Sequence, residues 1–79
     1  MKKIISLRQM ADDQSGIIRK IKPGGEMARR IREMGIVPGA EIVIIGRAPL
    51  KDPVAVKIKD FTLTLRNNEA DYILVETDD

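Results

Sequence analysis

The side chains that most often carry nucleophilic and metal chemistry are missing from this chain, which has no cysteine and no histidine in 79 residues. A disulfide framework, a zinc cluster and a Cys or His nucleophile are therefore excluded. The general bases that remain are carboxylates, lysines and Tyr72, and no spacing marks any pair of them. The inventory predicts a protein that is not an enzyme.

Two further sequence patterns, a glycine pair and pairs of adjacent acids, could indicate ligand sites. Gly24-Gly25 precedes a predicted helix, as in phosphate-binding loops, but neither GxxxxGK[ST] nor GxGxxG is present. Adjacent acids at Asp12-Asp13 and Asp78-Asp79 are typical of solvated loops and tails. We therefore expect no cofactor, no small-molecule substrate and no intrinsic metal site.

The charges are unevenly distributed, although the net charge is only +2. Residues 17–32 contain six bases and a single acid, Glu26, whereas residues 67–79 contain five acids and no base. Such polarity marks either an electrostatic partner surface or simply a solvated exterior.

The length of 79 residues indicates one domain, spanning residues 1–79. Apolar runs are far shorter than the roughly 20 residues needed to cross a bilayer, and the run after Met1-Lys2-Lys3 is too short for a signal peptide. We expect a cytoplasmic protein.

Turn signals divide the chain into short elements. A helical turn is expected over residues 6–10, and residues 16–21 (GIIRKI) predict a strand in which Ile18 and Lys20 face away from Ile17, Arg19 and Ile21. Residues 26–34 predict an amphipathic helix with Met27, Ile31 and Met34 on one face.

The stretch EMGIVPGAE ends that helix. Gly35 follows the last periodic residue and is expected as a left-handed cap, and Pro38-Gly39 has the chemistry of a type II turn. Between cap and turn, Ile36 and Val37 are expected to enter the core.

The second half of the chain reads as strands. They are predicted over residues 41–47, with a bulge or sharp bend at Gly46, and over residues 54–59, 61–66 and 73–76. Phe61 alternates in phase with core positions, Asp60 marks a tight hairpin, and Asn67 or Asn68 is expected to cap a helical turn. A mainly β fold follows: a small curled barrel of about five strands with one amphipathic α-helix over an opening and short helical turns.

Several of these segments resemble the FeoA family. The resemblance covers Leu7 to Glu76 and is carried by REMGIVPGAEI, RAPLKDPVAV and LTLRNNEADYILVE. Its most specific parts are Met34-Gly35-Ile36-Val37-Pro38-Gly39 and Ala48-Pro49-Leu50 with Asp52-Pro53. It implies a small SH3-like β-barrel that acts as an accessory to FeoB, the ferrous iron transporter with a cytoplasmic G-protein domain. Met34 stands where the family usually has Leu, and Lys51 where Gly is common, so this loop position is expected not to need a positive φ.

Two surfaces are candidates for partner binding. Arg29, Arg30 and Arg32 cannot all face inward, and their guanidinium groups suit carboxylates, although solubility and helix formation explain them equally well. The loop from Arg47 to Pro53 carries Leu50, which no periodic core face includes. Leu50 either anchors in a partner's pocket or caps the barrel's own core.

The resulting hypothesis is a non-enzymatic cytoplasmic accessory protein of iron homeostasis. It binds a FeoB-type transporter, through the G-protein domain, and modulates ferrous iron uptake without an iron site of its own, since the chain has no imidazole. It meets the membrane only through the transporter. The alternative is a nucleic-acid-binding small β-barrel, which the scarcity of aromatic stacking platforms disfavours, and a self-associating adaptor ranks third. The direction of the effect and the oligomeric state stay open.

Overall fold

The computed structural model describes residues 2–78, whose strands form one antiparallel sheet. The strands are β1 (Lys2–Ser6), β2 (Ser15–Ile21), β3 (Glu41–Arg47), β4 (Val54–Ile58), β5 (Phe61–Leu65) and β6 (Ile73–Asp78). The helical elements are the 3-10 turn η1 (Leu7–Gln9), α1 (Glu26–Glu33) and the single turn α2 (Asn67–Ala70). The predicted mainly β class is confirmed.

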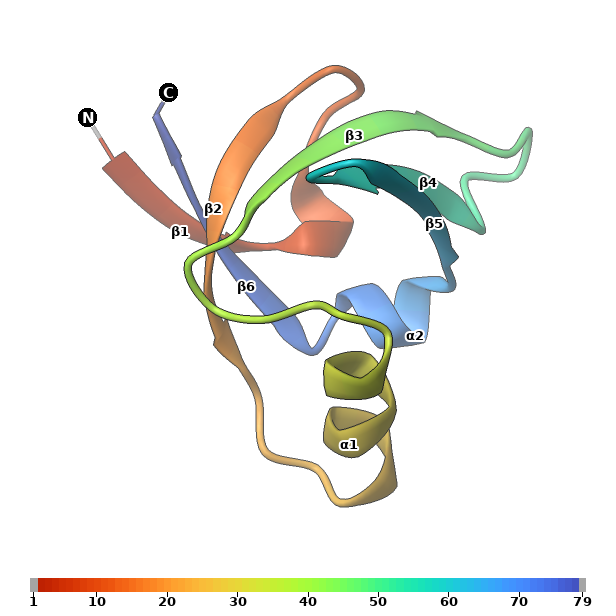
Figure 1. Ribbon diagram of the computed structural model, residues 1–79. Coiled ribbons are helices and arrows are strands. Elements are labelled where there is room, and N and C mark those ends of the chain that lie inside the picture. The colour runs from red at the N-terminus through yellow and green to blue at the C-terminus, as the bar shows by residue number, and fades with distance from the viewer. Residues whose placement is uncertain (1, 79) are drawn as a thin grey trace.

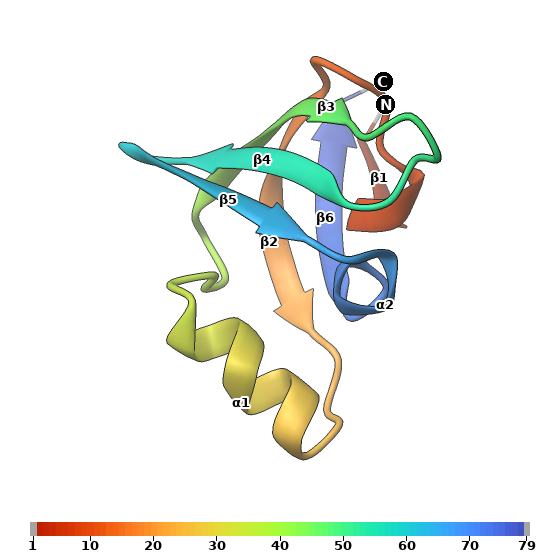
Figure 2. The same ribbon diagram turned by 90° about the vertical axis from the view of Figure 1, so that its right-hand side faces the viewer.

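The strand order in the sheet is β1-β6-β2-β3-β4-β5, and the sheet is strongly curved (Figure 1). The core lies inside this curl and consists mostly of Ile, Val and Leu side chains from every strand except β1, with contributions from η1, α1 and α2. Figure 2 shows α1 standing below the curled sheet, beyond the end of β2. The predicted curled β-barrel with one amphipathic helix is thus present. No helix within residues 2–78 is long and apolar enough to span a membrane.

β1 is a strand that the sequence pattern did not predict, so the sheet has six strands where about five were expected. Its sequence KKIIS has two adjacent isoleucines and no alternation, and it forms only by pairing with β6 at the other end of the chain, from Lys2 opposite Asp78 to Ser6 opposite Leu74. Pairing with β1 also extends β6 beyond the predicted end at Glu76.

The predicted facing of β2 is wrong after Ile18. The register against β6 shifts between Ile18 and Lys20, so Arg19 is the extra residue of a bulge. Because the bulge inserts one position, Ile21 returns to the core side that Ile18 also faces. Arg19 is left outside, where it pairs with Glu76.

α1 ends in the way the sequence predicts. Gly35 has φ +93°, its N–H donates to the Arg32 carbonyl at 3.0 Å, and the N–H of Ile36 reaches the Ile31 carbonyl at 3.4 Å. This pair of hydrogen bonds defines a Schellman motif, which requires a left-handed backbone conformation at Gly35. It delivers Ile36 into the core beside Ile31, as expected.

The Pro38-Gly39 turn is of type II, since Gly39 has φ +95° and the N–H of Ala40 donates to the Val37 carbonyl at 3.3 Å. Val37 is therefore the first residue of the turn, and its side chain is exposed. The expectation that Val37 enters the core with Ile36 is wrong.

The strands after this turn follow their predicted pattern with one exception. The register of β3 against β4 shifts between Ile44 and Gly46, which confirms the bulge, and Lys59 with Asp60 forms the tight hairpin. Phe61, however, is partly exposed, and its ring lies against Gly35 at the end of α1, where a Cβ would come within 3.3 Å of its Cζ. Phe61 lies opposite the buried Ile58, in phase with the core positions as predicted, but as the first residue of β5 it is not itself buried.

Candidate partner-binding surface

The loop between β3 and β4, residues 48–53, presents Leu50 to solvent. Its ends are joined by a bond from the Ala48 N–H to the Pro53 carbonyl at 3.0 Å, and the Lys51 N–H donates to the Ala48 carbonyl at 2.7 Å. Within this closed turn the side chain of Leu50 is 90% exposed. Leu50 therefore does not cap the core, and its role in partner binding stays a prediction.

The expectation that the position of Lys51 needs no positive φ is wrong. Its φ is +66°, so this loop position does adopt the left-handed region that the family's more common Gly favours. A left-handed Lys51 turns the chain immediately after Leu50, which keeps Leu50 at the tip of the loop.

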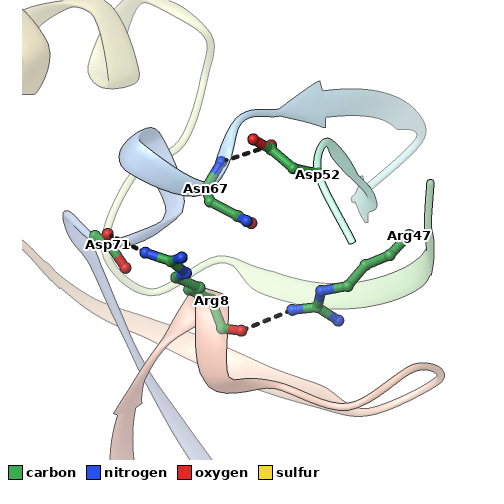
Figure 3. A network of polar contacts seen from close by, with 5 residues as sticks. All are labelled: Arg8, Arg47, Asp52, Asn67 and Asp71. Carbon is green, nitrogen blue, oxygen red and sulfur yellow. Dashed lines mark hydrogen bonds and ion pairs between the residues drawn. The ribbon is translucent and has the colours of Figure 1, made fainter. Parts of the chain in front are cut away.

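Polar contacts at both ends tie this loop to the helical elements (Figure 3). Before the loop, the Arg47 guanidinium donates to the carbonyl of Arg8 in η1 at 2.8 Å. After its tip, Asp52 Oδ1 accepts the N–H of Asn67, the first residue of α2, at 3.0 Å. Arg8 in turn pairs with Asp71, just after α2, at 3.0 Å.

Arg47 therefore acts mainly within the molecule. Its side chain is only 13% exposed and also pairs with Asp12 at 3.6 Å. The predicted contribution of Arg47 to partner binding is then indirect, because it fixes where the loop leaves the sheet. A shallow groove beside the loop, lined by Arg8, Arg47, Pro49 and Lys51 among others, has this guanidinium in its wall.

The three arginines of α1 differ in how they are held. Arg29 pairs with Glu26 one turn earlier on the same helix, and Arg30 pairs with Glu69 of α2 at 3.0 Å. Arg32 makes no ion pair within residues 2–78 and projects its charge to solvent. All three remain exposed, so the basic face of α1 exists, but Arg32 is the member whose charge is not already balanced.

Glu69 is the residue that sequence reasoning passed over. Its side chain is only 8% exposed, and its two carboxylate oxygens accept separately: Oε1 from the Arg66 N–H at 2.8 Å and Oε2 from Arg30 at 3.0 Å. The N-cap of α2 is Arg66, so the expected cap at Asn67 or Asn68 is wrong. The spacing Arg66-x-x-Glu69, with an acid three residues after the cap, was the available signal.

The two predicted surfaces are thus separate, and α2 lies between them (Figure 1). The N–H of Asn67 at its start bonds to Asp52 of the loop, and Glu69 two residues later pairs with Arg30 of α1. This arrangement connects the loop to α1 through α2. It offers no cluster of three or more acids within residues 2–78 that could hold a metal ion.

The chain is similar in sequence to proteins of ferrous iron transport. A family model described as the FeoA domain matches residues 5–77. A Porphyromonas gingivalis protein described as a fusion of Fe(2+) transport protein A with Fe(2+) transporter FeoB is 42% identical over 64 residues, which cover 81% of this chain. The chain corresponds to only 8% of the length of that relative.

Solved structures show the same fold. The FeoA-like protein from Clostridium acetobutylicum is 40% identical, with a TM-score of 0.90 over 98% of this chain and 90% of that protein. FeoA from Stenotrophomonas maltophilia, determined with zinc, is 25% identical, with a TM-score of 0.78 over 90% of this chain and 88% of that one. The latter is described as a procaryotic SH3 domain protein, which confirms the SH3-like architecture.

Proposed function

Since this chain belongs to the FeoA family, we propose that it is a non-enzymatic, cytoplasmic accessory protein of ferrous iron uptake. In this role it binds a FeoB-type transporter on its cytoplasmic side, through the G-protein domain, and modulates transport. The carrying observation is the fusion in Porphyromonas gingivalis, in which related FeoA and FeoB sequences share one chain. A covalent link between two domains raises their effective concentration, which benefits domains that bind each other.

The structure supports two contact regions for this binding. Leu50 is a nearly fully exposed apolar side chain on a loop fixed at both ends, and such pre-ordered anchors lose little entropy on docking. Arg32 adds a guanidinium group without an intramolecular acid, suited to a carboxylate on the partner. Arg29 and Arg30 contribute positive potential around it.

The test is a calorimetric titration of this chain against the soluble G-protein domain of a FeoB transporter. Leu50→Ser should weaken binding by about 30-fold, the effect of a hot-spot residue worth about 2 kcal/mol, with an unchanged melting temperature. Ile45→Ser is the matched control, because Ile45 is exposed on β3, away from the loop tip. Arg32→Glu should weaken binding and reduce its salt dependence.

Duplex DNA and single-stranded RNA serve as further arms at two salt concentrations. Binding to these polyanions that weakens steeply with salt, together with no heat on mixing with the G-protein domain, would replace this proposal by the nucleic-acid alternative. Equal losses for Leu50→Ser and Ile45→Ser would remove the loop from the interface.

A further inference from the structure

The free edge of β1 is a second place where this molecule can bind a polypeptide. We propose that this edge accepts an extended, acidic segment of a partner protein as an additional antiparallel or parallel strand. The proposal concerns a different part of the molecule from Leu50 and the arginines of α1, and it stands whether or not those residues contact a transporter. Main-chain hydrogen bonds provide affinity in such strand addition, and alternate side chains provide specificity.

The backbone of β1 has one unused side. Within residues 2–78, β1 pairs only with β6, and Figure 1 shows no element beyond it on the other side. The N–H of Ser6 donates to the side-chain oxygen of Gln9 at 2.9 Å, which orients it away from β6. Because antiparallel residues alternate between bonding toward the partner and away from it, the N–H and C=O of Ile4 also face outward, whereas those of Lys3 and Ile5 bond to β6.

The sheet face that carries Ile4 is mixed in polarity, because Ile4 lies directly opposite Glu76, which is paired with Lys2 and Arg19. Ile4 is 54% exposed, and it lines a shallow groove together with Ser6, Leu74 and Lys22. Ser6 lies opposite Leu74 in the ladder, and Lys20 lies opposite Leu74 on its other side, so these residues share one face of the sheet. An apolar residue on an added strand would lie next to Ile4.

The charges at this edge favour an acidic strand. Lys2 is already paired with Glu76 at 3.3 Å, but Lys3 of the same strand and Lys22, which lines the groove beside Ile4, form no ion pair within residues 2–78. Pairing two copies of β1 would gather four lysines in one short ladder, which is the usual protection of an edge against self-association. The other edge strand, β5, has no charged residue at all and lacks this selectivity.

The experiment uses blocked seven-residue peptides of alternating valine and glutamate, with an alternating valine and lysine peptide as the control. Binding is followed by backbone amide chemical shifts and hydrogen exchange of the full chain. The glutamate peptide should shift the amides of residues 2–6 and slow exchange at Ile4 by about tenfold or more at saturation. The lysine peptide should produce neither change.

Two variants at one position separate backbone from side chain. Ile4→Pro removes an N–H that the β6 ladder does not use, and proline is tolerated on an edge strand in that orientation, so peptide affinity should fall about fivefold or more. Ile4→Ala keeps the N–H and should bind within about threefold of the parent. Continued protection of the Lys3 and Ile5 amides shows that β1 is intact in both variants.

Lys3→Glu keeps every backbone group and provides a test even if Ile4→Pro disturbs the strand. It should lose affinity for the glutamate peptide and gain affinity for the lysine peptide. The proposal is overturned by peptide shifts that map to α1 or the 48–53 loop, by equal binding of both peptides, or by no binding. Concentration-dependent shifts of residues 2–6 without peptide would also overturn it, because a second copy would then occupy the edge.

Discussion

Replacing Glu69 by alanine should destabilise this protein more than any other single change at its surface ion pairs. The carboxylate is nearly buried, and it satisfies the Arg66 N–H at the start of α2 while holding Arg30 of α1. Its removal leaves one backbone donor without a partner inside the protein and releases one helix from the other. Both effects act on the same four-residue turn, α2.

The two losses are unequal in size. A hydrogen bond to a charged group contributes about 1.5–3 kcal/mol, and the Arg66 N–H is such a donor. The ion pair with Arg30 contributes about 0–1 kcal/mol, because the Arg30 side chain is more than half exposed and water screens the pair. Glu69→Ala should therefore lower the free energy of unfolding by about 1.5–4 kcal/mol, whereas Glu69→Gln, which keeps an acceptor oxygen, should cost only about 1 kcal/mol.

Urea unfolding of Glu69→Ala, Arg30→Ala and the double variant measures these contributions as a cycle. The coupling energy between Arg30 and Glu69 should be below about 1 kcal/mol, with most of the loss present in Glu69→Ala alone. The reasoning is refuted if Arg30→Ala costs as much as Glu69→Ala, or if Glu69→Gln is as damaging as Glu69→Ala. Either result would mean that charge, and not the capping of α2, is what Glu69 supplies.

Two further predictions use other parts of the sheet. Gly16→Ala would place a Cβ 2.4 Å from Val75 Cγ1 and 2.7 Å from the Glu76 carbonyl oxygen, so it should cost about 3 kcal/mol or more in urea unfolding, whereas Gly46→Ala, with nothing within 4 Å of its Cβ, should cost less than about 1 kcal/mol. The hydrogen bond from Arg19 lowers the pKa of Glu76 against the opposing effect of burial, with help from Lys2. A lowered pKa means that Glu76 adds stability above its ordinary value of 4.5 and that this stability is lost as the pH falls through the lowered pKa. Acid titrations of Glu76→Gln should show a shallower loss of stability below pH 4.5 than the parent, and parallel curves would contradict this assignment.

Local chemistry made part of the fold predictable. Gly35 and the Pro38-Gly39 pair each require a backbone conformation that few residues adopt, so their roles are visible without knowledge of the rest of the chain. The bulge beside Gly46 was indicated only by a glycine inside a β pattern, since Gly46 has no positive φ and Ile45 is the extra residue of the bulge. Interactions between distant segments were not predictable in this way. β1 is a strand through its pairing with β6 at the other end of the chain, and the ring of Phe61 lies against Gly35 at the end of α1.

In the candidate surface, too, features encoded locally were predictable and contacts between distant segments were not. Exposure of Leu50 and of the α1 arginines follows from their failure to fit a periodic face. The contacts that position them involve Arg8, Asp52 and Glu69, whose partners lie far away in the sequence. No local pattern pairs an arginine in one helix with a glutamate 39 residues later, and so the sequence predicted which residues are displayed but not what holds them in place.

The size of α2 decides how the two displayed regions are related. A helix of four residues is not stable alone, so its position is set by its contacts. Ala70 is buried in the core, and polar groups bond to α2 or its end, namely Asp52 from the loop, Arg30 from α1 and Arg8 from η1 through Asp71. A partner that contacts both Leu50 and Arg32 therefore meets a spacing that α2 maintains, and loosening α2 lets the two contacts move independently. For this reason Glu69→Ala should weaken binding to the G-protein domain although Glu69 is too buried to touch a partner. Stabilising co-solvents such as sucrose should recover the folded population of this variant without recovering its full affinity.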